Sequence, residues 1–361
     1  MNTTPTPQPA AVKPHIAKRN FALGVLNNYP DCEETRQFLT PEACGMLVGA
    51  GIDIYLEAGA GIDINYSDEA YAQNGCMLKT RAEALACDVV LSVRPLRSAD
   101  AEKMKRGAIL LCLSDPSLSR ESIEALSHRD VTMIALDKMI SDNGTPIFAR
   151  ILDEIDGRAA ILYAQEGLSF LGEGKGVLIG GIPGLQPCEV LIVGAGPRVI
   201  AAAKAAIQTG ARVTLMDNDI AALDEAMTAC GERLITSSIH PKVLYNDVKH
   251  ADVIIIDSCT REFELPEHLS LAMKDNVYLL DLKETIPSLI VPRSVAMAIS
   301  NVLINFFNDA LQSGGMRRMI SSVAGIRPGI ITYRGHLVDK ELAAALGMHA
   351  LDLAIMLTQS N

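Results

Sequence analysis

Two series of short apolar runs, separated by helical patterns, constrain the fold of this chain more than any other feature of its sequence. The first series comprises FALGVL (21–26), DIYLEAG (53–59), CDVVLSV (87–93), GAILLCLSD (107–115) and VTMIALD (131–137). The second comprises CEVLIVGAG (188–196), RVTLMD (212–217), DVIIID (252–257) and NVYLLD (276–281). Most runs are nearly continuous and rich in β-branched residues, which is typical of strands buried on both faces of a parallel sheet. The sequence therefore predicts an α/β fold with two doubly wound domains.

Helix boundary signals between the runs favour the same alternation. Thr40 is suited to cap a helix that has Pro41 at its first position, where the missing N–H costs nothing. Ser119 is a second candidate cap. Two helical patterns of the second series end at Gly210 and Gly231, and glycine favours the left-handed conformation found after helices. Strand, helix and strand thus follow one another in both series.

Two longer helical patterns, at about residues 151–171 and 292–311, flank the second series. The first pattern leads into GEGKG and then GVLIGGIPGLQP, a glycine-rich hairpin or loop at which we place the first domain boundary. Residues 1–20 are rich in Pro and Thr and are expected to form a disordered lead-in. A final helix is expected over residues 340–358.

A glycine turn in the second series points to a dinucleotide. Gly194 permits a tight turn after a strand, and Gly196 lets the backbone approach a pyrophosphate at the start of the next helix. Asp217 ends the following strand, where a carboxylate accepts hydrogen bonds from the adenosine ribose. This arrangement predicts NAD as the cofactor and favours it over NADP.

The glycine motif departs from the usual pattern at its third position, which is Val199. A turn of Rossmann type that no longer binds a dinucleotide therefore stays open as the alternative. Arg198 could assist a phosphate, although an exposed helical arginine is the commoner case. The predicted cofactor-binding residues are Gly194, Ala195, Gly196, Arg198, Val199 and Asp217.

Composition limits the classes of partner. The 361 residues include 32 Lys and Arg against 43 Asp and Glu, a net charge of −11 that disfavours nucleic-acid binding. The eight Cys are scattered without a CxxC pair or zinc-finger spacing, so we expect reduced cysteines and no metal site. The apolar runs are far shorter than the ~20 residues of a membrane span, and the N-terminal segment does not resemble a signal peptide. A cytoplasmic protein without a membrane partner is expected.

Several stretches together resemble the family of alanine dehydrogenase and the NAD-binding α subunit of proton-translocating transhydrogenase. They are ETRQFLTP (34–41), LEAGAGIDINYSDEAYAQNGC (56–76), GRAA (157–160), GVLIGGIPG (176–184) and GIITYRGHLVDKELAAALGM (329–348), the last being closer to alanine dehydrogenase. The resemblance implies a Rossmann domain (171–302) inserted into a discontinuous substrate domain (21–170 and 303–361). Substrate would lie in the cleft between the domains.

Some site residues follow from this resemblance. Arg36 falls on the arginine that holds the substrate carboxylate in alanine dehydrogenase, and a guanidinium suits bidentate carboxylate binding. Arg94 stands where the family has a substrate-binding lysine, so the charge is kept while a lysine-like acid–base role is lost. Asn301 aligns with an asparagine that faces the active site from the second linking helix.

The catalytic positions of the family differ in this chain. Where the family has its catalytic His, this chain has Ser114 and Asp115. A carboxylate there would need burial to move protons near neutral pH. The family's catalytic Asp has no clear equivalent, since Asp281 is followed by Leu, Lys283, Glu284 and Thr. Asp115, Lys283 and Glu284 are therefore the catalytic candidates.

The resemblance implies an NAD-dependent oxidoreductase that reversibly deaminates a small L-amino acid, with L-alanine, pyruvate and ammonia as the default reactants. One alternative is an NAD(P)H-dependent enzyme that couples an amine to an oxo acid, as saccharopine-type relatives do. Another is a sensor that binds NAD or a metabolite without turnover. The family also suggests a homo-oligomer, a hexamer or a dimer.

Overall fold

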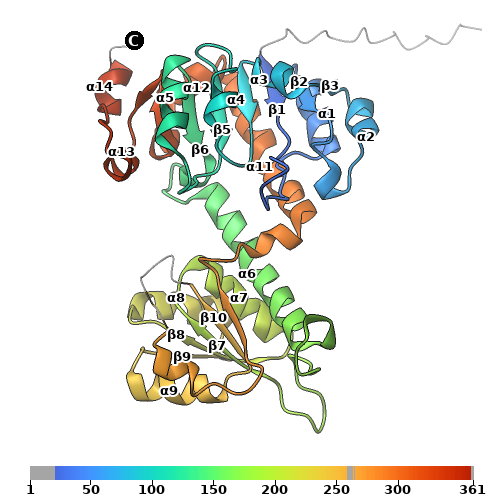
Figure 1. Ribbon diagram of the computed structural model, residues 1–361, viewed down its shortest axis with the longest axis vertical. Helices are drawn as coiled ribbons and strands as arrows, with labels where there is room; N and C mark the ends of the chain where they lie inside the picture. Colours follow the sequence, from blue (N-terminus) through green and yellow to red (C-terminus); the bar gives the residue numbers. More distant parts are fainter. Residues whose placement is uncertain (1–20, 258–262, 264, 359–361) are drawn as a thin grey trace, which may run out of the picture.

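The computed structural model describes residues 21–257, 263 and 265–358. Its strands form two sheets, one of eight strands and one of five. Figure 1 shows the two domains one above the other, joined by the helices α6 and α11. The eight-stranded sheet takes strands from both sides of the five-stranded one in the sequence. The predicted α/β fold, with a Rossmann domain inserted into a discontinuous domain, is confirmed.

The first sheet has the strand order β13-β12-β6-β5-β4-β1-β2-β3. Strands β1 to β6 run parallel, whereas β12 and β13 are antiparallel. The strands are β1 (Ala22–Val25), β2 (Asp53–Glu57), β3 (Met77–Lys79), β4 (Val89–Leu91), β5 (Ile109–Cys112), β6 (Thr132–Ala135), β12 (Ile330–Tyr333) and β13 (His336–Leu337). Strands β2 and β3 lie on one side of β1, and β4 lies on its other side. The point where the strand order reverses therefore lies between β1 and β4.

Helices cover this sheet. They are α1 (Pro41–Gly49), α2 (Asp68–Gln73), α3 (Arg81–Leu85), α4 (Ser98–Ala101), α5 (Arg120–His128), α12 (Met316–Ser322), α13 (Lys340–Leu346) and α14 (Leu353–Thr358), with short 3-10 turns η1 (Ile62–Ile64), η2 (Leu136–Lys138) and η5 (Ala324–Gly329). The expected caps are present, since Thr40 and Ser119 accept hydrogen bonds from the backbone of Ala43 and Ser122. The helix expected over residues 340–358 is wrong: Gly347, at φ +63°, ends α13, and α14 begins separately.

The second sheet has the order β11-β10-β7-β8-β9, and all its pairings are parallel. Its strands are β7 (Glu189–Val193), β8 (Arg212–Met216), β9 (Leu234–Ser237), β10 (Val253–Ile256) and β11 (Tyr278–Asp281). Its helices are α7 (Pro197–Gln208), α8 (Ile220–Cys230), α9 (Pro241–His250) and α10 (Glu267–Ser270). The strand order reverses between β7 and β10, and the glycine turn follows β7.

Two long helices connect the domains, α6 (Ile147–Leu168) and α11 (Pro292–Gln312), with η3 (Phe170–Gly172) and η4 (Pro287–Ile290) beside them. The expected linking helix at 151–171 starts earlier, after Pro146, and ends at Leu168 before η3. Near its middle α6 packs closely against α7, because a Cβ added at Gly157 would lie 2.2 Å from the carbonyl oxygen of Arg198. A side chain at this position would push the two helices apart.

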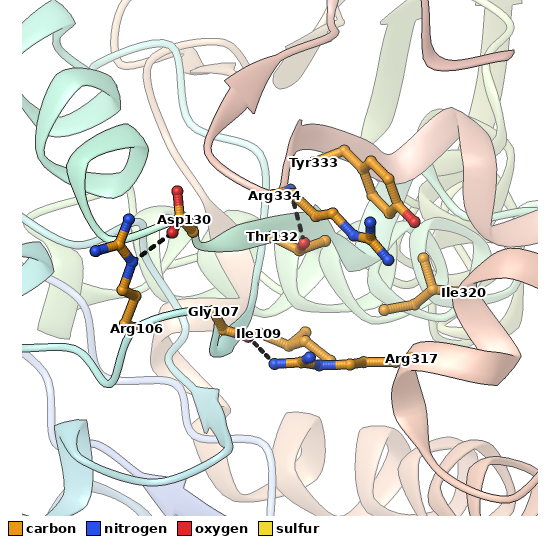
Figure 2. A pocket seen from close by; sticks show the side chains of 9 residues that line it. All are labelled: Arg106, Gly107, Ile109, Asp130, Thr132, Arg317, Ile320, Tyr333 and Arg334. Atoms are coloured by element: carbon orange, nitrogen blue, oxygen red, sulfur yellow. Dashed lines mark hydrogen bonds and ion pairs between the residues drawn. The ribbon is translucent and has the colours of Figure 1, made fainter. Parts of the chain in front are cut away.

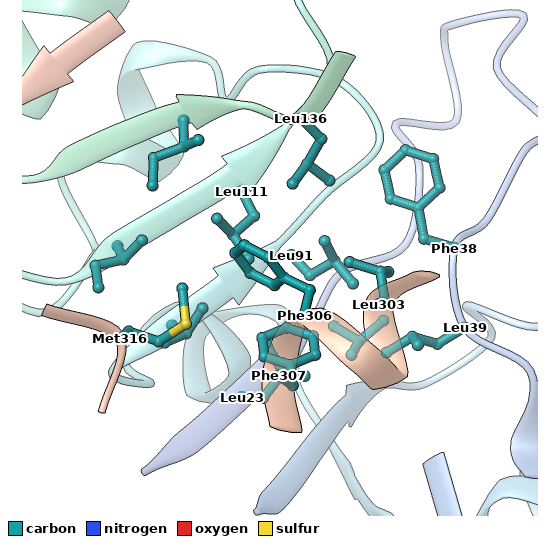
Figure 3. Packing of buried hydrophobic residues seen from close by; sticks show 14 of the residues in the cluster. Leu23, Phe38, Leu39, Leu91, Leu111, Leu136, Leu303, Phe306, Phe307 and Met316 are labelled. Atoms are coloured by element: carbon teal, nitrogen blue, oxygen red, sulfur yellow. The ribbon is translucent and has the colours of Figure 1, made fainter. Parts of the chain in front are cut away.

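The first domain has a hydrophobic cluster on each face of its sheet, and the larger one lies between the sheet and α11. Figure 3 shows Phe306 and Phe307 of α11 among leucines from the sheet, including Leu91 and Leu111. Within the described part of the chain, α11 is the one helix long and apolar enough to cross a membrane by length and composition alone. Its buried face is part of this core, and a core helix of a soluble protein passes the same test.

The cysteines that the structure describes are free, and most of them are buried. Cys112, for example, is fully buried on β5, and burial raises the pKa of its thiol well above the usual value. These cysteines behave as small apolar residues, as predicted. Cys259 lies outside the described residues, as do residues 1–20, where we expected the lead-in.

Candidate functional site

Polar side chains gather where the parallel strands of the first sheet end. Arg94 follows β4, Asp115 follows β5, and Asp137 follows β6, so all three stand at the carboxyl edge of the sheet. Asn28 follows β1 at the same edge, next to the point where the strand order reverses. Ligands of open parallel sheets bind outside the carboxyl ends of strands at such a point. This edge is therefore the candidate substrate site.

Arg36 lies at this edge, and Glu34 already occupies its guanidinium. The Nε of Arg36 donates to Glu34 at 2.8 Å and its Nη2 donates at 2.7 Å, and only 7% of Arg36 is exposed. Asn28 holds the backbone by donating to the Arg36 carbonyl at 2.9 Å. Burial alone would lower the pKa of the guanidinium, but the hydrogen bonds and charge of Glu34 outweigh burial and raise it. A substrate carboxylate would have to share Arg36 with Glu34.

Arg94 and Asp115, two of the predicted site residues, are in direct contact. The Nε and Nη2 of Arg94 lie 2.7 and 2.6 Å from Oδ2 of Asp115. Ser117 adds a backbone N–H to the other oxygen of Asp115 at 2.8 Å. Burial would raise the pKa of the Asp115 carboxyl, yet the hydrogen bonds from Ser117 and Arg94 lower it below its usual value. Asp115 is thus held as a carboxylate, which suits orienting Arg94 better than moving protons near neutral pH.

A cavity of about 580 Å³ opens beside Arg94 and Asp115. It is lined by polar side chains from the ends of β4 and β5, with Tyr29 and Arg97 at its wall. The ring of Tyr29 contacts two guanidinium carbons, that of Arg81 at 4.3 Å and that of Arg97 at 4.2 Å from its centre. These cation–π contacts fix the wall of the cavity.

Sequence reasoning missed Asp137 and Glu34. The Oδ1 of Asp137 accepts from the backbone N–H of Ser114 at 2.7 Å, and its Oδ2 accepts from the Ser114 hydroxyl. Asp137 ends the run VTMIALD, and a carboxylate directly after a buried parallel strand is the signal that could have found it. Glu34 has no comparable signal, because nothing in a sequence shows which guanidinium it will pair with.

The glycine turn of the second domain has the geometry for a pyrophosphate. Gly194 adopts φ +113°, which favours glycine, and a Cβ there would lie 3.3 Å from the carbonyl oxygen of Asp257. Gly196 directly precedes α7, so the N-terminal end of this helix, the positive end of its dipole, adjoins the turn. Because Gly194 and Gly196 have no side chain, the pyrophosphate of a dinucleotide can come close to the backbone of the turn. The residues present therefore fit NAD.

At the third position of the glycine motif, a valine side chain packs into the core of the second domain. Val199 is fully buried in the core of the second domain, together with Ile192 and Ala195. Asp217 follows β8 beside the turn, and its Oδ1 accepts from the backbone N–H of Asp219 at 2.8 Å. That hydrogen bond fixes the orientation of the carboxylate.

The remaining predicted residues lie elsewhere. Arg198 contacts the linking region rather than the glycine turn: its Nη1 donates to the Leu282 carbonyl at 3.1 Å and its Nε lies 3.5 Å from Asp153 of α6. Lys283 and Glu284 are exposed after β11, and Asn301 is exposed on α11. Among the described residues, no hydrogen bond or ion pair joins these three to Arg94 or Asp115.

Within the described ranges, no group of His, Cys, Asp and Glu is arranged to hold a metal ion. The carboxyl edge of the first sheet instead carries guanidinium groups that suit an anion. The carboxyl edge of the second sheet carries a glycine turn that suits a dinucleotide.

Replacing Asp115 with Asn is expected to destabilise the protein by about 1 kcal/mol at neutral pH, because it removes the partner of a half-exposed Arg94. The pKa of Asp115 is lowered in the folded state, so its contribution is complete above the unfolded pKa of about 4 and is lost as the pH falls below it. Urea unfolding of both proteins from pH 7 to pH 3.5 measures this. The difference should shrink with acid, while the exposed control Asp224→Asn stays near wild type; a pH-independent difference would contradict the assignment.

A Rossmann domain with a bare glycine turn, inserted into a second parallel-sheet domain, defines the class of protein. The alanine dehydrogenase/PNT N-terminal domain matches residues 27–151, and the corresponding C-terminal domain matches residues 160–259. The alanine dehydrogenase of Methanococcus maripaludis is 30% identical over 62% of this chain, a segment that spans 60% of that protein and so less than two thirds of it. That of Bacillus subtilis is 25% identical over 87% of this chain and 92% of its own length.

Solved structures show the same fold. An L-alanine dehydrogenase superposes with a TM-score of 0.80 at 22% identity, covering 90% of this chain and 99% of the other. The transhydrogenase from Sinorhizobium meliloti superposes with a TM-score of 0.71 at 17% identity, covering 88% and 99%. The chain belongs to the alanine dehydrogenase/PNT family. The resemblance inferred from the sequence is confirmed.

Proposed function

We propose that this chain is an NAD-dependent dehydrogenase that reversibly converts a small L-amino acid, NAD⁺ and water to the 2-oxo carboxylate, ammonium, NADH and a proton. L-alanine and pyruvate are the default substrate and product, as the names of the relatives suggest. The observation that carries the proposal is the pairing of two sites in one chain. The bare turn at Gly194 suits a dinucleotide, and the cavity at Arg94 suits a carboxylate.

The family binds NAD(H), and this chain offers matching residues. The turn at Gly194 and Gly196 and the N-terminus of α7 would hold the pyrophosphate, and Asp217 would accept from the ribose hydroxyls. A carboxylate at that place disfavours the extra phosphate of NADP. Bound NAD supplies the hydride acceptor of the reaction.

Arg94 would bind the substrate carboxylate. Asp115 holds its Nε and Nη2 on one side, and 39% of the Arg94 side chain stays exposed toward the cavity. Arg36, whose charge also interacts with those of Asp137 and Asp156, adds positive potential at the same edge. A carboxylate that enters the cavity would meet the guanidinium of Arg94, which Asp115 holds in place.

Proton transfer is assigned to residues after β11. Lys283 Nζ and the Glu284 carboxylate are exposed at the carboxyl edge of the second sheet, the edge that also carries the Gly194 turn. Asp115 is the less suitable acid because its pKa is lowered. Asn301 would contact substrate from the exposed face of α11.

The proposal includes a cytoplasmic homo-oligomer, a hexamer or a dimer, without a nucleic-acid or membrane partner. The net charge of −11 supports the absence of a nucleic-acid partner.

The test is a spectrophotometric assay in both directions. NADH oxidation is measured with ammonium and a panel of 2-oxo acids, and NAD reduction with a panel of L-amino acids. We expect turnover with NADH well above that with NADPH, and strong loss of activity in Arg94→Gln. Arg158→Gln, which removes an exposed arginine paired with Glu154 outside the cavity, is the control for general charge loss. No turnover with any substrate, in protein shown to be folded by circular dichroism, would contradict the proposal.

A second candidate, the reductive coupling of an amine with an oxo acid, is favoured by the cavity beside Arg94. At about 580 Å³ it has room for more than one small substrate. NADH oxidation that requires both an oxo acid and a second amino acid, and does not occur with ammonium, would favour this candidate. Calorimetric binding of NADH without any turnover would instead favour the sensor.

A further inference from the structure

A second pocket lies at the opposite edge of the first sheet, where the strands begin. It has a volume of about 430 Å³ and is lined mainly by Arg106, Ile109, Arg317, Ile320, Tyr333 and Arg334. Ile109 is the first residue of β5, and Arg317 belongs to α12. Tyr333 is the last residue of β12, and Arg334 follows it in the turn before β13. The candidate substrate site is at the carboxyl ends of the same strands. The pocket is therefore a separate feature of the fold.

Positive charge dominates this pocket in a chain whose net charge is −11. Three guanidinium groups line it against a single carboxylate, Asp130, whose Oδ2 lies 2.5 Å from Nε of Arg106. Asp88 stands just outside and pairs with Lys105 at 2.6 Å, and the charge of Arg317 also acts on it. Within the described residues, no carboxylate forms an ion pair with Arg317 or Arg334.

The fold holds these two arginines at fixed places. Arg317 Nη2 donates to the backbone carbonyl of Gly107 at 2.8 Å. Arg334 has φ +48°, its backbone N–H donates to Thr132 Oγ1 at 3.1 Å, and its guanidinium carbon lies 5.5 Å from the centre of the Tyr333 ring. Figure 2 shows their side chains entering the same hollow from α12 and from the β12–β13 turn, with Ile320 beside them.

We propose that this pocket binds a small dianion, with two carboxylate or phosphate groups on a compact frame. Each guanidinium presents a planar set of donors that matches one carboxylate or phosphate group. Arg317 and Arg334 come from different elements, so they suit two groups on one molecule better than a single ion. Ile109, Ile320 and Tyr333 supply the apolar wall that would cover the frame.

The proposal is tested by isothermal titration calorimetry on the full chain at constant ionic strength. Citrate and succinate form the carboxylate arm, and pyrophosphate and inorganic phosphate form the phosphate arm. We expect Arg317→Gln and Arg334→Gln each to weaken binding of the better dianion by about tenfold or more, since charged hydrogen bonds are lost. Arg120→Gln and Arg158→Gln, exposed arginines in helical ion pairs elsewhere, should leave the affinity unchanged.

Three results would overturn the proposal. The first is no binding of any of the four anions, and the second is an equal loss of affinity in the control variants, which would mean diffuse attraction to surface charge. The third is a change of oligomeric state in Arg317→Gln or Arg334→Gln without anion binding, as seen by analytical ultracentrifugation. That outcome would make the pocket a contact between copies of the chain. None of these measurements depends on dehydrogenase activity.

Discussion

Replacing Arg36 with Met is expected to destabilise the protein by about 3–5 kcal/mol, because it leaves Glu34 buried without its partner. Both side chains are almost fully buried, and Glu34 accepts two hydrogen bonds from the guanidinium and one from the Arg36 backbone. Urea unfolding at neutral pH measures the loss. As a control, Arg120→Met removes an exposed ion pair with Glu124 and should cost less than about 1 kcal/mol.

The double variant Glu34→Gln/Arg36→Met separates the contribution of this pair to stability from its contribution to substrate binding. Since a buried ion pair replaced as a whole is often nearly neutral, we expect it to regain most of the stability lost in the single variant. It should not regain the affinity for a carboxylate substrate, because a guanidinium is still missing. If the double variant is as unstable as Arg36→Met, the loss comes from packing and the buried charge of Glu34 is not its cause.

Replacing Gly157 with Ala is the second change expected to have a large effect. The new Cβ would lie 2.2 Å from the carbonyl oxygen of Arg198 and 2.7 Å from the Ala201 Cβ, and both neighbours belong to α7. Because the closest atom is backbone, the helices α6 and α7 must separate. We expect a loss of about 3 kcal/mol or more, in the range of strongly disruptive core changes. Thermal unfolding monitored by circular dichroism measures it.

A matched control is available in the same chain. Gly49 ends α1, and a Cβ there would meet no atom within 4 Å. Gly49→Ala should change the stability by no more than about 1 kcal/mol. NADH binding should also weaken in Gly157→Ala, since α7 begins at the glycine turn. Equal stabilities of the two variants would contradict the close packing of α6 on α7.

The longer apolar runs made most of the fold predictable from sequence. Buried parallel strands such as β5 and β10 are continuous and apolar, and the runs that contain them give both domains. The short strand β3 (Met77–Lys79) has only three residues and little burial, so no periodic signal marks it. The antiparallel pairing of β12 with β6 joins distant parts of the chain, which local patterns cannot show.

The sequence indicated where Arg94 and Asp115 lie in the fold, but it did not indicate which residues the predicted site residues contact. The chain places Arg94 and Asp115 after adjacent strands, and β4 and β5 then bring them into an ion pair. For Arg198, the position in the sequence did not predict the contacts. It follows the glycine turn, but its side chain contacts Asp153 and Leu282. A long arginine side chain reaches several partners, and tertiary packing decides which of them it meets.

Because one domain is inserted into the other, the ribosome makes the whole inserted sheet before it makes the last strands of the first sheet. Thr332 of β12 donates a hydrogen bond to Val131, which precedes it by 201 residues. At ribosomal speeds this separation corresponds to about 10–40 s. Throughout that interval β6 is an unpaired sheet edge, the kind that invites pairing with another chain. The last strand of the Rossmann domain ends at Asp281, before β12 begins at Ile330, so this domain can fold while the first sheet still lacks its last two strands.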